Sequence, residues 1–362
     1  MSKPYADFLP RNKLIAPLKN SFQNDIILSK YWRIMRYTSC SWINGGLDFR
    51  PDSIVLCCFS WLQGYEEYVL VDNYFGEKID WAKLFEKKRA LINLQKSGKT
   101  ADFCHNCIYQ EERDWVDDDS INCLLFNHWT NCNSSCIYCD LGQEHEFYNR
   151  QKSYDILPIL KDMKENGILK IIDGSFVSFG GGEPTVLKDF DEILNLLIEV
   201  GFRVIRINTS GIKYSKAIED GLKNKSVDIV TSVDSGSAEI YRKIKRVDCF
   251  DKVWQNLKNY AKAAANKNDV KAKFIIIPDV NDTQKDIDDF FDCVEKNDLR
   301  AVSFSVEKNW ANDTPAKIFR ETDKAKKIYD LLLYSENKSR ELGLFLELYS
   351  EGIGFKNLME KQ

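Results

Sequence analysis

The sequence predicts an α/β fold with a parallel sheet between about residues 119 and 310. Apolar runs of strand length alternate there with amphipathic segments of helical length. Strands that are separated by helices are joined by right-handed parallel crossovers, so a parallel sheet or a partial barrel follows. The chain has 362 residues, which is more than one average domain needs, and its cysteine-rich N-terminal part is a separate compositional unit.

Six apolar runs are the expected strands, at 121–126, 176–179, 204–207, 227–233, 274–277 and 301–306. The amphipathic segments between them are the expected helices, at 154–166, 187–200, 250–265 and 283–297. In the helix after the second strand, Thr185 is the expected N-cap and Gly201 lies past the end. A last helix at 316–342 and an edge strand at 344–348 follow the sixth strand.

Three cysteines lie in a short loop directly after the first strand. Cys132, Cys136 and Cys139 form a C-x3-C-x2-C pattern. Three thiolates suit an iron-sulfur cluster, and a missing fourth cysteine leaves one iron open to another ligand. Zinc is the alternative, but a structural zinc site usually has a closed set of four nitrogen and sulfur ligands. The nearest nitrogen candidates, His128 and His145, lack the spacing of a zinc finger.

A second motif follows the second strand, where Gly180, Gly181 and Gly182 precede Glu183 and Pro184. Glycines let a backbone approach a ligand closely, and a carboxylate accepts hydrogen bonds from an ammonium group. A tight turn into the next helix explains an isolated run of this kind equally well. Both motifs are expected on one rim, because ligands of such sheets bind at the carboxyl ends of the strands.

Together, the two motifs resemble those of the radical S-adenosylmethionine (radical SAM) superfamily. The resemblance implies a curved (β/α)6 partial barrel of the TIM type. It also implies a [4Fe-4S] cluster held by Cys132, Cys136 and Cys139. S-adenosylmethionine would then chelate the open iron through its amino and carboxyl groups.

The resemblance extends to further contacts with S-adenosylmethionine. Gly181, Gly182 and Glu183 match the loop that binds its amino group, and Tyr138 matches the aromatic position near its adenine. Polar residues after the third and fourth strands match, by their place in the fold, contacts to its carboxylate or ribose: Asn208, Ser210, Ser232 and Asp234. The alternative for these four is a turn residue that hydrogen-bonds its own backbone.

The N-terminal part carries Cys40, the adjacent pair Cys57 and Cys58, and the C-x2-C pair Cys104 and Cys107. Cys40, one of the adjacent pair and the C-x2-C pair supply enough ligands for a cluster or a zinc site. This part resembles the SPASM-type auxiliary cluster domain, with two departures. It precedes the radical SAM core instead of following it, and it has too few ligands for the usual two clusters. We therefore expect one auxiliary [4Fe-4S] cluster, with zinc as the alternative.

The expected domains follow from these assignments. Residues 1–37 are an N-terminal extension, 38–118 the SPASM-like domain, 119–310 the radical SAM partial barrel, and 311–362 a C-terminal helix and edge strand. A net charge of -4 gives no broad electrostatic footprint for nucleic acid. No apolar run spans a bilayer, and the polar start MSKPYADF is not a signal peptide. We expect a cytoplasmic protein, in which eleven cysteines argue for metal and against disulfides.

The resemblance implies an oxidoreductase that cleaves S-adenosylmethionine to a 5′-deoxyadenosyl radical, which takes hydrogen from a substrate. A cytosolic donor such as flavodoxin or ferredoxin would supply the electron. A peptide side chain, modified during maturation of a ribosomally made peptide, is the first expectation for the substrate, and a sugar or polysaccharide precursor is the alternative. Two interpretations from other classes are an iron-sulfur electron-transfer protein and a zinc-stabilised binding protein.

Overall fold

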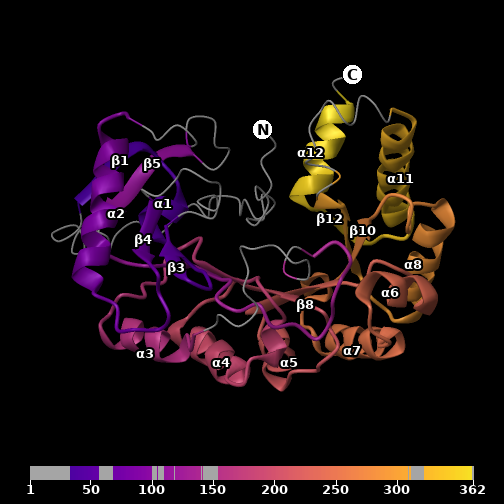
Figure 1. Cartoon of the computed structure of the whole chain (residues 1–362), viewed down its shortest axis with the longest axis horizontal. Helices are drawn as coiled ribbons and strands as arrows, with labels where there is room; N and C mark the ends of the chain where they lie inside the picture. Colours follow the sequence, from indigo (N-terminus) through magenta and orange to yellow (C-terminus); the bar gives the residue numbers. More distant parts are fainter. Residues whose placement is uncertain are drawn as a thin grey trace, which may run out of the picture.

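The chain folds into an α/β structure in which a curved β-sheet carries helices on its outer side (Figure 1). The structure is a computed structural model, and it describes residues 33–56, 68–99, 104, 110–117, 119–139, 141, 154–308, 310 and 322–360. Its strands are β1 (Arg33–Ser39), β2 (Gly46–Phe49), β3 (Ser53–Val55), β4 (Val69–Asp72), β5 (Glu111–Asp117), β6 (Cys123–Phe126), β7 (Phe176–Phe179), β8 (Ile205–Thr209), β9 (Val227–Ser232), β10 (Val270–Ile276), β11 (Ala301–Val306) and β12 (Phe345–Leu348).

Within these residues, most strands belong to one ten-stranded sheet of order β12-β11-β10-β9-β8-β7-β6-β2-β3-β4. Neighbours from β12 to β2 are parallel, whereas β3 and β4 are antiparallel additions at one edge. The six predicted strands are β6 to β11, and the predicted edge strand is β12. The prediction of a parallel α/β fold with a partial barrel is therefore confirmed.

The helices are α1 (Ser41–Gly45), α2 (Trp81–Lys96), α3 (Leu157–Glu165), α4 (Phe190–Val200), α5 (Lys216–Lys223), α6 (Ala238–Lys245), α7 (Phe250–Ala263), α8 (Gln284–Lys296), α11 (Thr322–Glu341) and α12 (Ser350–Met359), with short 3-10 helices η3 (Pro184–Val186) and η4 (Lys267–Asp269). The helices predicted between the strands correspond to α3, α4, α7 and α8. The helices α5 and α6 are only eight residues long, which is shorter than the window over which apolar periodicity is read, so they were not predicted.

The start of α4 differs from the prediction. Thr185 lies inside η3 and does not cap α4, whose N-cap is Asp189. Pro184 begins the separate turn, and the Thr185 amide donates to the carboxylate of Glu183 (3.1 Å). At the other end, Gly201 has a φ of 116°, as expected for a residue that ends a helix in the left-handed region.

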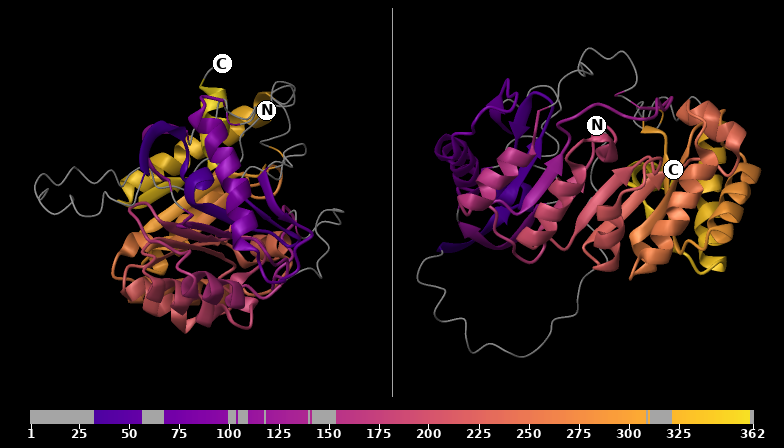
Figure 2. Two further views of the ribbon diagram at one scale, coloured as in Figure 1. Left: turned by 90° about the vertical axis from the view of Figure 1, so that its left-hand side faces the viewer. Right: turned by 90° about the horizontal axis from the view of Figure 1, so that it is seen from below.

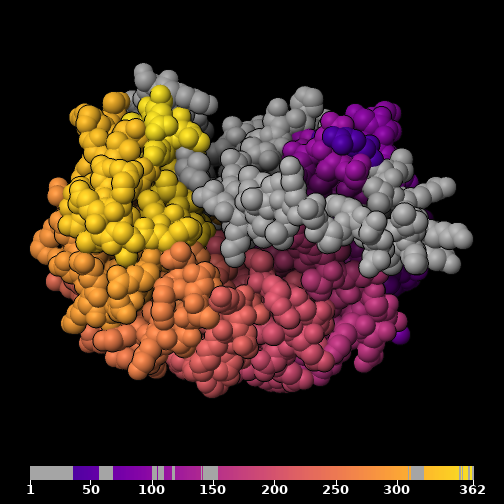
Figure 3. All heavy atoms as spheres, turned by 180° about the vertical axis from the view of Figure 1, so that it is seen from behind, coloured from indigo at the N-terminus to yellow at the C-terminus, as the bar shows by residue number. Residues whose placement is uncertain are grey.

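The outer helices cover the convex face of the sheet. Figure 2 shows α3, α4, α5, α7 and α8 in a row along the strands when the molecule is seen from below. Figure 3 shows, from behind, the C-terminal elements (yellow) and the N-terminal elements (purple) on opposite sides of the molecule. Among the described residues, none of the helices combines the length and the apolar character that crossing a bilayer requires.

The convex face of the sheet is apolar. Phe179 of β7 packs edge-on against Phe190 of α4 at 5.5 Å between ring centroids, and Phe274 of β10 packs against Phe290 of α8 at 5.2 Å. All four side chains are buried. Burial of such rings between sheet and helices supplies a large part of the stability of the fold.

The concave face is polar. Because side chains alternate along a strand, the neighbours of the buried phenylalanines point to this face. The strand register places on it Asp48, Leu125, Ser178, Arg206, Asp228, Lys271, Lys273, Ser303 and Glu347. Arg206 donates to Asp228 (2.8 Å) and to Glu347 (2.6 Å), and Lys271 donates to Asp228 (2.9 Å). These ion pairs join β8, β9, β10 and β12 across the barrel interior.

The N-terminal part joins the same sheet. The short strand β2 pairs in parallel with β6, so its carboxyl end lies on the same rim as the predicted site. The sheet therefore continues across the boundary expected at residue 118. The division of the chain into the four expected domains stays a prediction.

Candidate active site

The candidate active site is built around the cysteine loop, residues 127–139, which follows β6. Cys132 is exposed, Cys136 and Cys139 are half-buried, and none of the three forms a disulfide. The Cys139 amide donates to the Cys136 carbonyl (3.1 Å) and closes a tight turn. The Ser134 hydroxyl lies 3.4 Å from Cys132 Sγ and 3.6 Å from Cys136 Sγ. The three predicted cysteines therefore lie together in one folded loop at the rim.

The glycine loop, residues 180–183, packs directly on the cysteine loop. The Gly182 amide donates to the Trp129 carbonyl (3.0 Å), and the Glu183 amide donates to the Asn131 carbonyl (2.9 Å). A Cβ on Gly181 would lie 2.8 Å from the Trp129 oxygen, and one on Gly182 would overlap the Asn131 oxygen. Gly181 also has a φ of 67°, which favours glycine. The glycines therefore let the two loops touch, a role beyond the ligand approach expected from the sequence.

The Glu183 carboxylate is buried and receives several hydrogen bonds. Its Oε1 accepts from the Thr185 amide (3.1 Å), the Thr185 hydroxyl (2.5 Å) and the Thr209 hydroxyl (2.8 Å). Its Oε2 accepts from the Ser210 amide (2.5 Å). Because each carboxylate oxygen has two lone pairs, Oε2 keeps capacity for one more donor. Glu183 thus ties the ends of β7 and β8 together and still presents an acceptor.

Two of the predicted polar residues of β8 lie on this rim. The Asn208 amide group donates to the Phe179 carbonyl (3.0 Å) and accepts from the Tyr349 hydroxyl (3.0 Å). The Ser210 hydroxyl donates to the Asn133 side chain (2.9 Å). Asn208 therefore connects β8 to its neighbour and to the residue after β12, and Ser210 connects β8 to the cysteine loop.

The predicted residues of β9 lie further along the rim. Ser232 is half-buried and ends the strand. Asp234 is fully buried and accepts from the Tyr138 hydroxyl (2.6 Å). Lys245 donates to the Tyr138 oxygen (2.6 Å) and forms an ion pair with Asp234. The structure thus brings Tyr138 and Asp234 into contact with each other and with Lys245, which no sequence motif indicated.

The strand β2 contributes a further residue, Asp48, which no sequence motif indicated. The Asn127 side chain donates to Asp48 Oδ1 (2.9 Å), and Arg50 Nε donates to Asp48 Oδ2 (2.9 Å). Burial raises the pKa of the Asp48 carboxyl above its usual value, although Arg50 and Asn127 lower it. A Cβ on Gly180 would overlap the Asn127 side chain, so Asp48 supports the surface on which the glycine loop rests.

The family comparison agrees with this geometry. The profile of the Radical SAM superfamily matches residues 126–292, a span that contains the cysteine loop, the glycine loop and strands β7 to β10. The chain contains a radical SAM domain. The domain supports an enzymatic function, and its family implies a [4Fe-4S] cluster and S-adenosylmethionine as cofactors.

The radical SAM domain has counterparts among curated and solved proteins. A stretch of 130 residues is 35% identical to the probable GTP 3',8-cyclase of Saccharolobus islandicus (strain M.14.25 / Kamchatka #1), which is 35% of this chain and 40% of that protein. A stretch of 240 residues is 25% identical to the GTP 3',8-cyclase of Haemophilus influenzae (strain PittEE), covering 57% of this chain and 68% of that one. The chain therefore spans about 40% of the length of the first of these relatives. Streptococcus suis SuiB bound to S-adenosylmethionine aligns with a TM-score of 0.46 and 16% identity, over 74% of this chain and 55% of SuiB.

The thiols of the radical SAM domain fit an iron-sulfur cluster. Within the described residues, no three His, Cys, Asp or Glu side chains converge on a point that would hold a single metal ion. The cysteines that hold a cubane [4Fe-4S] cluster each bind a different iron, so they need not converge. A cluster held by these three thiolates would keep one iron without a cysteine ligand, and the cysteine loop shares its rim with the glycine loop.

The predicted auxiliary site lies largely outside the described residues. Cys57, Cys58 and Cys107 are not among them. Cys40 is buried directly before α1, and Cys104 is buried with its Sγ 3.6 Å from the Tyr68 hydroxyl. The auxiliary cluster on these cysteines stays a prediction.

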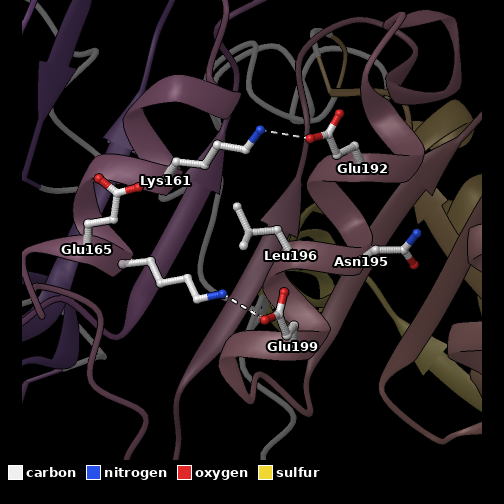
Figure 4. Close-up of a pocket in the computed structure, with 7 residues that line it drawn as sticks. Lys161, Glu165, Glu192, Asn195, Leu196 and Glu199 are labelled. Carbon is white, nitrogen blue, oxygen red and sulfur yellow. Dashed lines mark hydrogen bonds and ion pairs between the residues drawn. The ribbon is translucent and has the colours of Figure 1, made fainter.

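A groove on the outer surface lies away from the radical SAM site. It has a volume of about 540 Å³ and lies between α3 and α4, on the convex side of the sheet (Figure 4). Two ion pairs cross it, Lys161 with Glu192 and Lys164 with Glu199, both at 2.8 Å. Ion pairs between such exposed side chains contribute little to stability. The groove is therefore a solvated junction between two neighbouring helices.

Proposed function

We propose that this protein is a radical SAM enzyme whose cysteine loop and glycine loop together hold an iron-sulfur cluster and S-adenosylmethionine. Cys132, Cys136 and Cys139 bind the cluster through their thiolates and leave one iron for the amino and carboxyl groups of S-adenosylmethionine. When bound, the cluster supplies the electron that cleaves S-adenosylmethionine to a 5′-deoxyadenosyl radical, which takes a hydrogen atom from the substrate. The residues of the chain contribute binding, orientation and exclusion of water.

The packing of the two loops carries the proposal. The amides of Gly182 and Glu183 donate to carbonyls of the cysteine loop, which supports a site in which a ligand of the open iron lies beside the glycine loop. In the proposed site, Gly181, Gly182 and Glu183 receive the amino group, and Oε2 of Glu183 accepts one of its N–H groups. A site whose loops are already held by backbone hydrogen bonds binds its ligand without further ordering.

The ends of β8 and β9 are the proposed neighbours of the rest of S-adenosylmethionine. Asn208, Ser210 and Ser232 supply polar groups to its carboxylate and ribose, and the ring of Tyr138 packs near its adenine. Asp234 supports the site through Tyr138 and does not contact S-adenosylmethionine itself, because its carboxylate is buried and already accepts a hydrogen bond from the Tyr138 hydroxyl. This assignment predicts smaller effects on binding for the three polar side chains than for Glu183.

We propose a peptide side chain as the substrate, with a sugar or polysaccharide precursor as the alternative. The cysteine pattern of the N-terminal part supports the first choice, since SPASM-like domains accompany many peptide-modifying radical SAM enzymes. The names of the curated relatives add GTP as a third compound to test, although the matched stretch is about 40% of the first relative's length. Neighbouring reading frames discriminate among these choices: a short peptide gene favours the first, and glycosyltransferase-like genes favour the second.

The proposal includes an auxiliary [4Fe-4S] cluster held by Cys40, Cys57 or Cys58, Cys104 and Cys107. Iron and sulfide analysis of anaerobically purified protein tests it. Two four-iron clusters give about eight irons per chain, whereas about four irons plus one zinc would assign the N-terminal site to zinc. A cytoplasmic location and a flavodoxin or ferredoxin partner complete the proposal, because reduced thiols and a low-potential electron are needed for this chemistry.

The deciding experiment measures 5′-deoxyadenosine. The reduced protein is given S-adenosylmethionine alone, and product is quantified for the wild type, Cys136→Ala and Cys249→Ala. We expect product from the wild type and from Cys249→Ala, whose half-buried cysteine lies before α7 and outside the site. We expect none from Cys136→Ala. A reduced wild type that carries its cluster and forms no product would identify an electron-transfer protein instead.

A further inference from the structure

Tyr138 of the cysteine loop forms a hydrogen-bonded group with two buried side chains, Asp234 and Lys245. The Tyr138 hydroxyl donates to Asp234 Oδ2 (2.6 Å), and the Lys245 ammonium donates to the Tyr138 oxygen (2.6 Å). Lys245 also forms an ion pair with Asp234. The exposed fraction is 0% for Asp234 and 4% for Lys245. The proposed reaction makes no direct use of this ion pair.

The backbone of the cysteine loop is bound to the same place. The Ser135 amide donates to the Lys245 carbonyl (3.1 Å), and the Ile137 amide donates to the Ile244 carbonyl (3.0 Å). Both carbonyls belong to the last turn of α6, where a helix has no internal partners for its carbonyl groups. The cysteine loop therefore caps α6, and the helix end in turn fixes the residues on either side of Cys136.

Asp234 is held from several directions. Its Oδ1 accepts from the Ile275 amide (2.8 Å), its amide donates to the Lys273 carbonyl (3.1 Å), and its carbonyl accepts from the Asn281 side chain (2.8 Å). Its φ is 61°, in the left-handed region that Asp and Asn enter more readily than other residues with a side chain. Asp234 is thus a fixed point at the junction of β9 and β10.

Apolar contacts support the same docking. Ile137 and Tyr138 pack against a small cluster formed by Ile244, Ile275 and Ile277. This cluster is separate from the main core of the protein. The half of the loop that carries the second and third cysteines is therefore attached to α6 and β10 by both apolar and polar contacts.

A buried charge pair is stable only when its partners are close. Taking an ion out of water is costly, and removal of one partner leaves the other charge uncompensated. Burial alone would lower the pKa of Lys245, but the Asp234 carboxylate raises it above its usual value. The ion pair with Asp234 thus compensates the buried ammonium directly.

We propose that Lys245 and Asp234 are positioning residues for the iron-sulfur cluster. They hold Tyr138 by its hydroxyl and thereby keep the adjacent Cys139, and with it Cys136, in place against the ends of α6, β9 and β10. This inference rests on the proposed ligation of the cluster by the cysteine loop. It follows that the reduction potential and the spectrum of the cluster depend on the three side chains, since both respond to the charges and hydrogen bonds around the sulfur ligands.

The test compares full-length variants that were purified anaerobically. Tyr138→Phe removes one oxygen atom and keeps the ring, and Lys245→Met removes the charge at nearly constant length. Lys271→Met is the matched control, because Lys271 is 4% exposed, as Lys245 is, and pairs with Asp228 (2.9 Å) on the concave face, apart from the cysteine loop. Iron content, the electron paramagnetic resonance spectrum with and without S-adenosylmethionine, and the midpoint potential of the cluster are measured for each variant.

We expect Tyr138→Phe and Lys245→Met to shift the midpoint potential, to change the response of the spectrum to S-adenosylmethionine, and to lose iron in air about tenfold faster, as the loss of a charge-assisted hydrogen bond implies. In the double variant the two effects should be less than additive, because both act on one hydrogen-bonded group. Lys271→Met should lose thermal stability and keep the wild-type spectrum and potential. Tyr138→Phe keeps the test decisive where Lys245→Met does not fold.

Wild-type spectra and potentials in Tyr138→Phe, or equal changes in Lys271→Met, would overturn the inference. A wild-type protein that binds no cluster at all would overturn the proposed function instead. The two failures are therefore distinguishable.

Discussion

The substitution Gly182→Ala should separate the glycine loop from the cysteine loop. A Cβ at this position would lie 2.8 Å from Trp129 Cδ1 and closer still to the Asn131 carbonyl oxygen, whereas ordinary contacts begin at 3.4 Å. The nearer obstacle is backbone, so no side-chain rotation relieves the overlap. Relief requires the loops to move apart by roughly 1 Å, and overpacking of this kind costs about 1–3 kcal/mol.

Activity should fall together with stability. A displacement of roughly 1 Å at a catalytic centre lowers the rate by about a hundredfold. We therefore expect Gly182→Ala to form 5′-deoxyadenosine about a hundredfold more slowly than the wild type, and its free energy of unfolding in urea to be lower by about 1–3 kcal/mol. Single-turnover product formation by the reduced protein measures the first effect, and denaturant titration measures the second.

Two further glycines provide matched controls. Gly181 and Gly98 have φ values of 67° and 75°, so alanine at either position carries the cost of a left-handed residue, about 1–2 kcal/mol. Only Gly181 has a neighbour in the way, the Trp129 oxygen at 2.8 Å, whereas nothing lies within 4 Å of a Cβ on Gly98. Gly98→Ala should lose stability alone, and Gly181→Ala should lose stability and activity. A wild-type rate in Gly182→Ala would refute the reasoning.

Three other predictions concern buried charge and the auxiliary site. Glu183→Gln turns one acceptor oxygen into an NH2 group that faces a donor, so we expect the free energy of unfolding to fall by roughly 1–3 kcal/mol. Calorimetry should also show at least about tenfold weaker binding of S-adenosylmethionine, and wild-type affinity would contradict the assigned role. Burial raises the pKa of Asp228, but Arg206 and Lys271 outweigh it and lower the pKa from 3.8 to about 2. A pKa lowered on folding stabilises the protein above pH 3.8, and this contribution is lost as the pH falls toward 2. Asp228→Asn should therefore be less stable than the wild type by about 2 kcal/mol near neutral pH. Urea unfolding measures this difference in free energy, and a difference that stays the same in acid would count against the ion pairs. Cys104→Ala should lower the iron content from about eight to about four per chain and leave 5′-deoxyadenosine formation intact. An unchanged iron content would contradict the auxiliary cluster.

Local patterns predicted the central part of the fold well. The apolar runs between residues 121 and 306 became β6 to β11, because a strand buried between helices needs a continuous run of apolar side chains. The short helices α5 and α6 escaped prediction, and Thr185 was wrongly expected to cap α4. In that case the carboxylate of Glu183 attracts the Thr185 amide and a separate turn forms first.

The sequence by itself determined the radical SAM motifs and the parallel arrangement of the strands, because cysteine spacing, glycine runs and apolar periodicity are properties of a few consecutive residues. Only the tertiary structure decided which side chains support the motifs. Asp48 reaches Asn127 across 79 positions, and Lys245 reaches Tyr138 across 107. Such contacts depend on which strand ends become neighbours on the rim, and no local pattern encodes that neighbourhood.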